Sequence, residues 1–294
     1  MVTVRVPATS ANLGSGFDCL GLALAVTAEV AVTVEPPDGN DHSLAPMITT
    51  AARAAYREAG RPEPAELRVV WEDSNSKRPI PIARGLGASA AARAAGIVAA
   101  NVLMDRPLSD DQLLNVGAQL EGHADNIAPA LFGGMQIVIR DAGDWLRLAV
   151  PLAEDLKIVL FIPDLEMLTR ESRARLPQRL KREDAIFNVG RAAMLVAALE
   201  QGRWELLDAS TQDRLHQSAR SEQFPALYDI IDAAKDAGAH GGYLSGAGST
   251  IAAFATDDVE RVARLMQQAA VARGYSGRTM ITEPSTEGAT IIQP

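Results

Sequence analysis

The chain has 294 residues, with 28 Lys or Arg against 37 Asp or Glu, which gives a formal net charge of −9 at pH 7. This acidic balance argues against a protein that coats nucleic acid or binds membranes through a polybasic surface, although it permits a small anion in a local pocket. A hydrophobic share of 47% and a charged share of 22% are typical of a folded chain with a substantial core.

Signals for secretion, membrane insertion or a structural metal are not visible in the sequence. The first ten residues lack the basic and apolar pattern of a signal peptide, and no apolar segment reaches the roughly 20 residues of a spanning helix. The single Cys19 cannot form an internal disulfide, and the histidines do not show the spacing of a zinc site. We therefore expect a soluble protein in the cytoplasm.

The first half of the chain shows the patterns of both strands and helices. Strands are expected at residues 2–6, 21–34, 66–71 and 135–140, and helices at residues 47–59, 88–104 and 109–121. Alanine density and the lack of internal proline strongly favour the helix at 88–104. Ser109 is the expected N-cap of the helix that follows.

A second half is expected to begin with a strand at residues 156–162, which ends at Pro163. Helices are then expected at residues 185–201, 224–237 and 259–273, and strands at residues 241–244 and 250–255. Because strands and helices do not alternate regularly, the pattern favours the α+β class over a doubly wound parallel sheet. We place the domain boundary before the strand at 156–162, which gives domains 1–154 and 155–294.

The sharpest local motif is the segment Arg84-Gly85-Leu86-Gly87-Ala88-Ser89, which precedes the alanine-rich helix. Glycines let the backbone approach a ligand closely, and the N–H groups at the start of a helix form an anion site. Residues 76–93 hold four cations and no acid, namely Lys77, Arg78, Arg84 and Arg93. The motif favours a phosphate site, and its plain alternative is a structural glycine turn.

Two common nucleotide motifs do not account for this loop. The chain has no GxxxxGK(S/T) string, which excludes a P-loop. The dinucleotide pattern GxGxxG/A is met by Gly85, Gly87 and Ala90, but Pro79 and Pro81 in the preceding segment do not fit a buried parallel strand. The context therefore rejects a Rossmann fold.

Other segments also carry residues with chemical potential: the opening loop 7–21 (PATSANLGSGFDCLG), residues 121–131 (EGHADNIAPAL), the glycine loop 241–250, and residues 167–182 with six cations and one acid. Taken singly, each has an ordinary explanation. Asn and Asp often satisfy loop backbone, a glutamate at a helix end is often solvated, and glycines form turns. A basic helix face is often only solvated.

In their order and spacing, the glycine motif and the segments 7–21, 121–131 and 241–250 resemble the small-molecule kinases of the galactokinase, homoserine kinase, mevalonate kinase and phosphomevalonate kinase (GHMP) superfamily. The resemblance covers residues 1–255 and is closest to the homoserine kinases. It implies transfer of the γ-phosphate of ATP to the side-chain hydroxyl of L-homoserine, in threonine biosynthesis, with Mg²⁺ as the metal. The implied fold has an N-terminal domain like ribosomal protein S5 domain 2 and a ferredoxin-like C-terminal domain, with ligands between them. The family also suggests a homodimer.

The resemblance assigns roles to residues whose chemistry suits them. It implies that Asp18, Ser89 and Glu121 are catalytic, and that Ser89 and Glu121 hold Mg²⁺. The implied ATP contacts are Arg84, Gly85, Leu86, Gly87, Ala88, Ser89, Ala90, Gly246 and Gly248. The implied substrate contacts are Asn12, Asp18, His123, Thr169, Arg173 and Arg220. Arg214 competes with Arg220 for its role, and whether Asp18 acts as a general base is open.

The sequence departs from the family pattern at several positions. Ala88 and Ser249 stand where a serine and a proline are usual, and Arg93 places a large cation one turn after Ser89. Two alternative functions therefore stay in view. One is a sister kinase acting on another small alcohol such as mevalonate, and the other is a catalytically silent relative that binds ATP or an amino acid.

Overall fold

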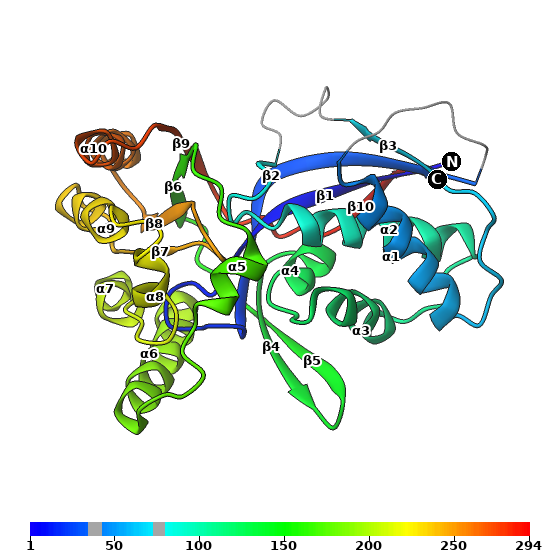
Figure 1. Ribbon diagram of the computed structural model, residues 1–294, viewed down its shortest axis with the longest axis horizontal. Coiled ribbons are helices and arrows are strands. Elements are labelled where there is room, and N and C mark those ends of the chain that lie inside the picture. Colours follow the sequence, from blue (N-terminus) through cyan, green and yellow to red (C-terminus); the bar gives the residue numbers. More distant parts are fainter. Residues whose placement is uncertain (35–42, 73–79) are drawn as a thin grey trace.

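The protein is described here from a computed structural model, which covers residues 1–34, 43–72 and 80–294. These residues form two antiparallel sheets, and helices cover each sheet (Figure 1). Both termini lie at the same end of the first sheet, far from the second sheet. The arrangement is α+β, as the element pattern predicts.

The first sheet is built around two long neighbouring strands. Its strands are β1 (Val2–Ala11), β2 (Leu20–Thr33), β3 (Arg68–Glu72), β4 (Met135–Asp141), β5 (Asp144–Val150) and β10 (Thr290–Gln293). The strand order is β10-β1-β2-β4-β5, and β3 also pairs with β2. The helices beside it are α1 (Ala45–Glu58), α2 (Ala88–Leu103), α3 (Asp110–Glu121) and α4 (Ile127–Phe132).

The second sheet has the strand order β7-β8-β6-β9. Its strands are β6 (Lys157–Pro163), β7 (Gly241–Leu244), β8 (Ile251–Ala255) and β9 (Gly277–Thr282). The helices of this half are α5 (Thr169–Ala174), α6 (Arg182–Gln201), α7 (Leu207–Ser210), α8 (Gln217–Ser221), α9 (Leu227–Asp236) and α10 (Val259–Ala272), with a 3₁₀ turn at Trp204–Leu206. The first strand in sequence lies between the third and the last, which is the ferredoxin-like arrangement.

Most predicted helices and strands are confirmed to within a few residues. The prediction that the first strand ends at Pro7 is wrong, because β1 continues to Ala11. Its pairing with β2 shifts between Pro7 and Ala8, so the sheet passes the proline at an irregularity and then resumes. Strands β5, β9 and β10 and helix α4 were not predicted.

One hydrophobic core joins the two halves. Buried residues of β1 and β2 share a cluster with Ile158 and Leu160 of β6, Leu195 of α6 and Phe254 of β8. Strand β10 returns from the second half to pair with β1. The domain boundary between residues 154 and 155 stays a prediction. The paired strands and the shared core show why the halves are not separate bodies.

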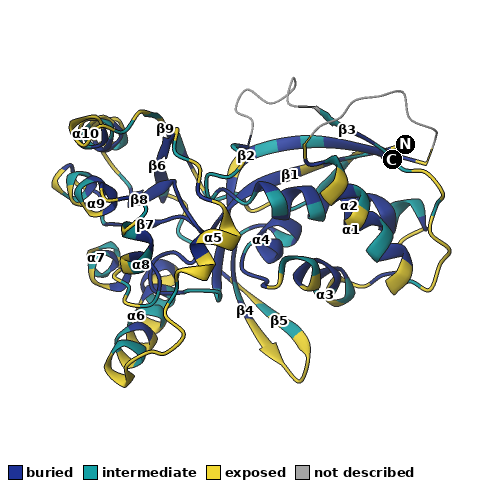
Figure 2. Ribbon diagram, viewed as in Figure 1, coloured by how far each residue is buried: buried dark blue, intermediate teal, exposed yellow. Residues whose placement is uncertain are grey.

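Burial follows this layered arrangement. Figure 2 shows buried strands between helices whose outer faces are exposed, most clearly on α6 and α10, and an exposed hairpin formed by β4 and β5. Within the ranges 1–34, 43–72 and 80–294, no helix has the length and apolar character that crossing a membrane requires.

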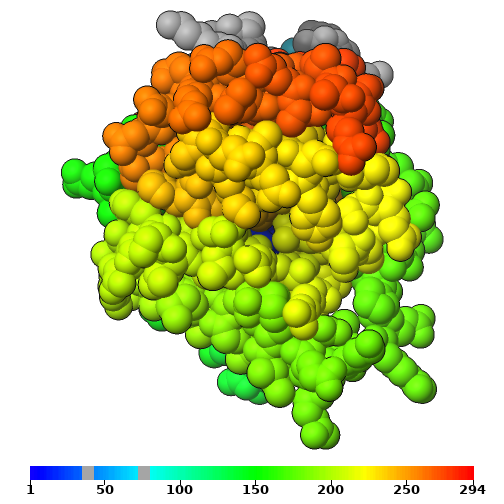
Figure 3. Space-filling model, turned by 90° about the vertical axis from the view of Figure 1, so that its left-hand side faces the viewer, coloured from blue at the N-terminus to red at the C-terminus, as the bar shows by residue number. Residues whose placement is uncertain are grey.

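The loop between β1 and β2 extends from the first half into the second. Ser15 Oγ donates a hydrogen bond to the Ser210 carbonyl at 2.7 Å, and Asn188 Nδ2 donates to the Ser15 carbonyl at 3.1 Å. Gly14 lies so close to Thr211 that a Cβ atom would come within 2.1 Å of the Thr211 carbonyl oxygen. Figure 3 shows blue atoms of the N-terminal segment in a hollow among the yellow and yellow-green residues of this half. The loop is therefore placed by both halves.

Candidate active site

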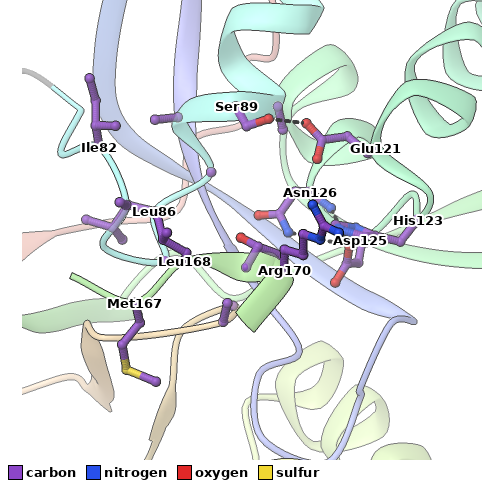
Figure 4. A pocket seen from close by; sticks show the side chains of 18 of the residues that line it. Ile82, Leu86, Ser89, Glu121, His123, Asp125, Asn126, Met167, Leu168 and Arg170 are labelled. Carbon is purple, nitrogen blue, oxygen red and sulfur yellow. Dashed lines mark hydrogen bonds and ion pairs between the residues drawn. The ribbon is translucent and has the colours of Figure 1, made fainter. Parts of the chain in front are cut away.

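A cavity of about 680 Å³ lies where the two halves meet. This volume suits a small-molecule ligand. Figure 4 shows it close up, with Ser89 and Glu121 on one side and Leu86, Met167 and Leu168 on another. The predicted site residues that line it are Asn12, Asp18, Gly85, Leu86, Gly87, Ala88, Ser89, Ala90, Glu121, His123, Thr169, Arg173, Arg220 and Gly246.

The start of α2 forms one wall of the cavity. Gly87 is the N-cap residue, with a φ of 66°, and no side chain caps the helix. The first turn contains no acid, so its backbone N–H groups and the positive end of the helix dipole face the cavity uncompensated. A Cβ atom on Gly87 would come within 1.8 Å of Thr9 Oγ1, so only glycine fits there. This wall has the features that anion sites at helix N-termini share.

The second glycine loop supports the first. Ser245 Oγ donates to the Gly85 carbonyl at 2.6 Å, and a Cβ on Gly85 would meet the Ser245 carbonyl oxygen at 2.2 Å. The Gly246 carbonyl accepts hydrogen bonds from Asn12 Nδ2 and Arg220 Nη1, both at 2.9 Å. The glycine pattern at 241–250 therefore brings three separate segments into close contact.

Two predicted ATP contacts lie behind this wall. Arg84 donates from Nε to the Pro163 carbonyl at 2.8 Å and from Nη2 to the Asp164 carbonyl at 2.9 Å. Its guanidinium thus ties the glycine loop to the end of β6. A Cβ atom on Gly248 would come within 2.9 Å of Met167 Sδ, so Met167 packs closely over this glycine. Direct contacts of Arg84 and Gly248 with ATP stay predictions. Lys77 and Arg78 lie outside the described residues.

Ser89 and Glu121 meet at one side of the cavity (Figure 4). Ser89 Oγ donates to Glu121 Oε1 at 2.7 Å, although the two residues lie on different helices. A hydroxyl and a carboxylate are hard oxygen donors that suit Mg²⁺, a cation that keeps several water and phosphate ligands. Within the described ranges, no group of three or more His, Cys, Asp and Glu gathers as a metal site. The residues present therefore fit a magnesium ion held jointly with phosphate.

Asp18 and Arg173 form a bidentate ion pair across the cavity. Arg173 Nη1 and Nη2 donate to Asp18 Oδ2 and Oδ1 at 2.8 and 2.7 Å. Asn12 Oδ1 accepts the Asp18 backbone N–H at 3.1 Å, which fixes the loop that carries the carboxylate. The Arg173 guanidinium also lies 5.5 Å from the centre of the Phe17 ring. One cation and one anion of the cavity lining are thus held next to each other.

Arg220 also lines the cavity, and only 2% of it is exposed. Its Nη1 donates to His216 Nδ1 at 2.9 Å, and His216 Nε2 donates to the Gly14 carbonyl at 2.8 Å. Within the described part of the chain, Arg220 Nε is buried without a partner, a donor that a ligand oxygen would satisfy.

The sequence leaves Arg214 and Arg220 as alternatives for the same substrate contact. Its guanidinium instead lies over the Phe187 ring, 3.9 Å from the centre, and faces Asp184 at 3.4 Å. The geometry favours Arg220.

His123 is held by Asp125, with Nδ1 2.6 Å from Asp125 Oδ1. Burial by itself lowers the pKa of His123, but the hydrogen bond and charge of Asp125 outweigh it and raise that pKa above its usual value. Asp125 Oδ1 also accepts the Asn126 backbone N–H at 3.0 Å, and Thr9 Oγ1 donates to Asn126 Oδ1 at 2.8 Å. The raised pKa favours the protonated form of this imidazole beside the cavity.

Sequence reasoning did not assign Asp125, Phe17 or His216, although all three lie next to predicted residues. Asp125 lies within the EGHADN motif, but the sequence does not indicate that its carboxylate pairs with His123. The sequence places Arg93 among the cations around the glycine motif and as a departure from the family pattern, without a role, and in the structure it contacts both Ser89 and Glu121. Such roles depend on contacts between distant segments, which a single sequence does not show.

Two family models match the chain. The model described as GHMP kinases N terminal domain matches residues 46–134, and the one described as GHMP kinases C terminal matches residues 195–272. A two-sheet kinase with a glycine loop at a helix N-terminus is the class that the fold and the site define.

The relatives narrow this class. A homoserine kinase of Caldicellulosiruptor bescii is 36% identical, over 99% of this chain and 97% of its own, and one of Deinococcus radiodurans is 40% identical, over 95% and 92%. The crystal structure of homoserine kinase from Cytophaga hutchinsonii superposes with a TM-score of 0.84 at 25% identity, over 99% of this chain and 97% of that one. The chain belongs to the homoserine kinases of the GHMP kinase family.

Proposed function

We propose that this protein is an ATP-dependent homoserine kinase, which transfers the γ-phosphate of ATP to the side-chain hydroxyl of L-homoserine. One observation carries the proposal. The cavity places an anion-binding helix N-terminus next to a carboxylate and two arginines, in the arrangement that a phosphate donor and an amino acid require. The proposed products are ADP and O-phospho-L-homoserine.

ATP would occupy the end of the cavity formed by the glycine loop. Its adenine would pack on the apolar wall of Leu44, Met47, Ile82 and Leu168, and its phosphates would accept from the N–H groups at the start of α2. Ser89 and Glu121 would hold Mg²⁺, which when bound neutralises charge on the transferred phosphoryl group. Ala88 leaves the backbone N–H in place, so the missing serine hydroxyl does not remove the site.

L-Homoserine would occupy the other end. Its carboxylate would pair with Arg173 and Arg220, and its ammonium would pair with Asp18. Asn12 orients Asp18, and Thr169, at the first turn of α5, would face the substrate with Arg173. Both Asp18 oxygens already accept from Arg173, which favours substrate binding over a role as proton acceptor. Positioning and charge neutralisation suffice for phosphoryl transfer to an alcohol.

A homodimer in the cytoplasm completes the proposal. Ile139, Leu146 and Leu148 of the β4–β5 hairpin are at least half exposed, and apolar side chains exposed together often lie at an interface.

The test is the release of ADP by the purified protein with Mg²⁺ and ATP over a panel of homoserine, threonine, mevalonate and galactose, with the phosphorylated product identified by ³¹P NMR. Of these four compounds, we expect only homoserine to be phosphorylated. Preference for mevalonate would establish a sister kinase. Nucleotide binding without turnover on any alcohol would establish a silent relative, and either result would overturn the proposal.

A further inference from the structure

Arg93 occupies the point where Ser89 and Glu121 meet. It lies one turn after Ser89 on α2, so both side chains project from the same helix face. Arg93 Nη1 donates to Ser89 Oγ at 3.0 Å and forms an ion pair with Glu121 Oε1, the same oxygen that accepts from Ser89. All three residues line the cavity.

The environment makes this contact energetically significant. The Arg93 side chain is 19% exposed and that of Glu121 is 10% exposed, so water screens the pair only weakly. The neighbours of Arg93 on α2 are mostly buried alanines, which offer it no other charge. A long arginine stem still lets the guanidinium reach into the cavity from the same position.

We propose that Arg93 is a tethered counter-ion of the phosphate site. It neutralises Glu121 when a nucleotide is bound without metal, and it must leave Glu121 and Ser89 when Mg²⁺ takes their oxygens. The inference rests on the proposed function, because it supposes that nucleotide phosphates lie at the start of α2.

Simple electrostatics gives this role two opposite consequences. A guanidinium is always charged and cannot ligate a metal, so it competes with the metal for the same two oxygens. It also offsets the repulsion between the Glu121 carboxylate and an anionic phosphate chain. Arg93 should therefore weaken metal binding and strengthen metal-free nucleotide binding.

The experiment measures binding without turnover. Arg93→Met keeps most of the length of the side chain but removes its charge. Arg53→Met on α1 is the matched control, since the Arg53 side chain is partly exposed and lies outside the cavity lining. Isothermal titration calorimetry with the non-hydrolysable ATP analogue AMPPNP, in the presence of EDTA, gives the Kd of the nucleotide without metal. Electron paramagnetic resonance of Mn²⁺ in saturating AMPPNP gives the metal Kd. No homoserine is present.

For Arg93→Met we expect the metal-free AMPPNP Kd to rise at least about fivefold and the Mn²⁺ Kd to fall about tenfold, as expected for one unit charge a few ångströms away. Arg53→Met should leave both constants within twofold. Simple loss of structure would weaken both kinds of binding, so opposite shifts are specific to the counter-ion. Arg93→Gln provides the same comparison if Arg93→Met does not fold.

Shifts in the same direction, or no shift beyond that of Arg53→Met, would overturn the counter-ion. A wild-type protein that fails to bind AMPPNP with Mn²⁺ would instead overturn the proposed function. The two failures are thus distinguishable, because the wild-type titration alone reports on the second.

Discussion

Asp18 and Arg173 neutralise each other in an ion pair when no ligand is bound. Their two hydrogen bonds are 2.8 and 2.7 Å long, and the two residues lie 155 positions apart in the sequence. A zwitterionic amino acid can replace this pair with two pairs of the same kind, so the charges stay balanced on binding. The pair thus keeps both side chains positioned for an α-amino acid.

Arg173→Ala tests this role. We expect KM for homoserine to rise about 10- to 100-fold, the effect of losing one charged hydrogen-bonding partner, with a much smaller change in KM for ATP. Steady-state kinetics with each substrate varied provides the measurement. Arg175→Ala, at the exposed end of the same helix, is the control. A larger change in KM for ATP than for homoserine would remove Arg173 from the substrate contacts.

His216 links the stability of the protein to pH. Burial lowers the pKa of its ring from 6.5 to about 4, although Asp213 acts in the opposite direction. Below pH 6.5 the ring of His216 is protonated in the unfolded chain but stays neutral in the folded protein until the pH reaches about 4. The stability of the folded state that is present above pH 6.5 is therefore lost as the pH falls through about 4. The free energy of unfolding should drop by up to ~3 kcal/mol over this range from His216 alone. Urea unfolding of wild type and His216→Gln between pH 7 and 4 measures it, and equal pH slopes would contradict the assignment.

Helix α3 carries Glu121 at its C-terminal end. The cap at the start of this helix helps to hold the helix that positions Glu121. Ser109 accepts the Gln112 backbone N–H at 3.3 Å, and Gln112 Oε1 accepts the Ser109 N–H at 3.0 Å. This capping box satisfies two backbone donors that the helix cannot pair itself.

Ser109→Ala should lower the free energy of unfolding by about 1 kcal/mol, because the capping acceptor is lost. Chemical denaturation gives the value. Ser109→Asn retains a capping oxygen and should stay within a few tenths of a kcal/mol of wild type. An equal loss for both variants would show that the cap is not the cause.

The glycine loop before α2 has a steric requirement that its sequence only suggests. Gly87→Ala places a methyl group against Thr9 at a positive φ, so the loop must move away from its position. We expect KM for ATP to rise by at least tenfold, measured by steady-state kinetics. Gly190→Ala in α6, where a Cβ meets nothing within 4 Å, is the control and should preserve the KM. Equal KM values for both variants would contradict a tight phosphate loop.

The molecule as a whole is held together across its two halves. The β1–β2 loop is bound by residues of α6 and α7, β10 pairs with β1, and buried side chains of both sheets share one cluster. Figure 1 shows the short α5 at the junction of the two halves. Thr169 and Arg173 of this helix line the cavity. Because residues of both halves line the cavity, the position of each half depends on the position of the other.

We therefore expect one cooperative unfolding transition for the whole chain. In differential scanning calorimetry, the calorimetric enthalpy should equal the van't Hoff enthalpy. Saturating AMPPNP with Mg²⁺ should raise the single midpoint, since a ligand that binds only the folded state stabilises it. Two resolved transitions would contradict the continuous core.

Much of the fold followed from local patterns. The alanine run of α2, the Ser109 cap and the alternating strands are short-range signals, so propensity alone located them. Strands β9 and β10 were not predicted because they pair with β6 and β1, which lie far away in the chain. Strand β5 pairs with β4, the strand just before it, and was also not predicted. Strand β1 continues past Pro7 because its pairing with β2 resumes at Ala8.

The sequence by itself determined the family, the glycine loop and the residue types of the site, because these depend on motifs that occupy contiguous residues. Only the tertiary structure decided that Asp18 meets Arg173, that Arg220 instead of Arg214 faces the cavity, and that Arg93 lies between Ser89 and Glu121. Each of these contacts joins segments far apart in the chain or selects between neighbouring side chains. Packing of the two halves fixes such choices, since local propensity carries no information about which distant group a side chain will meet.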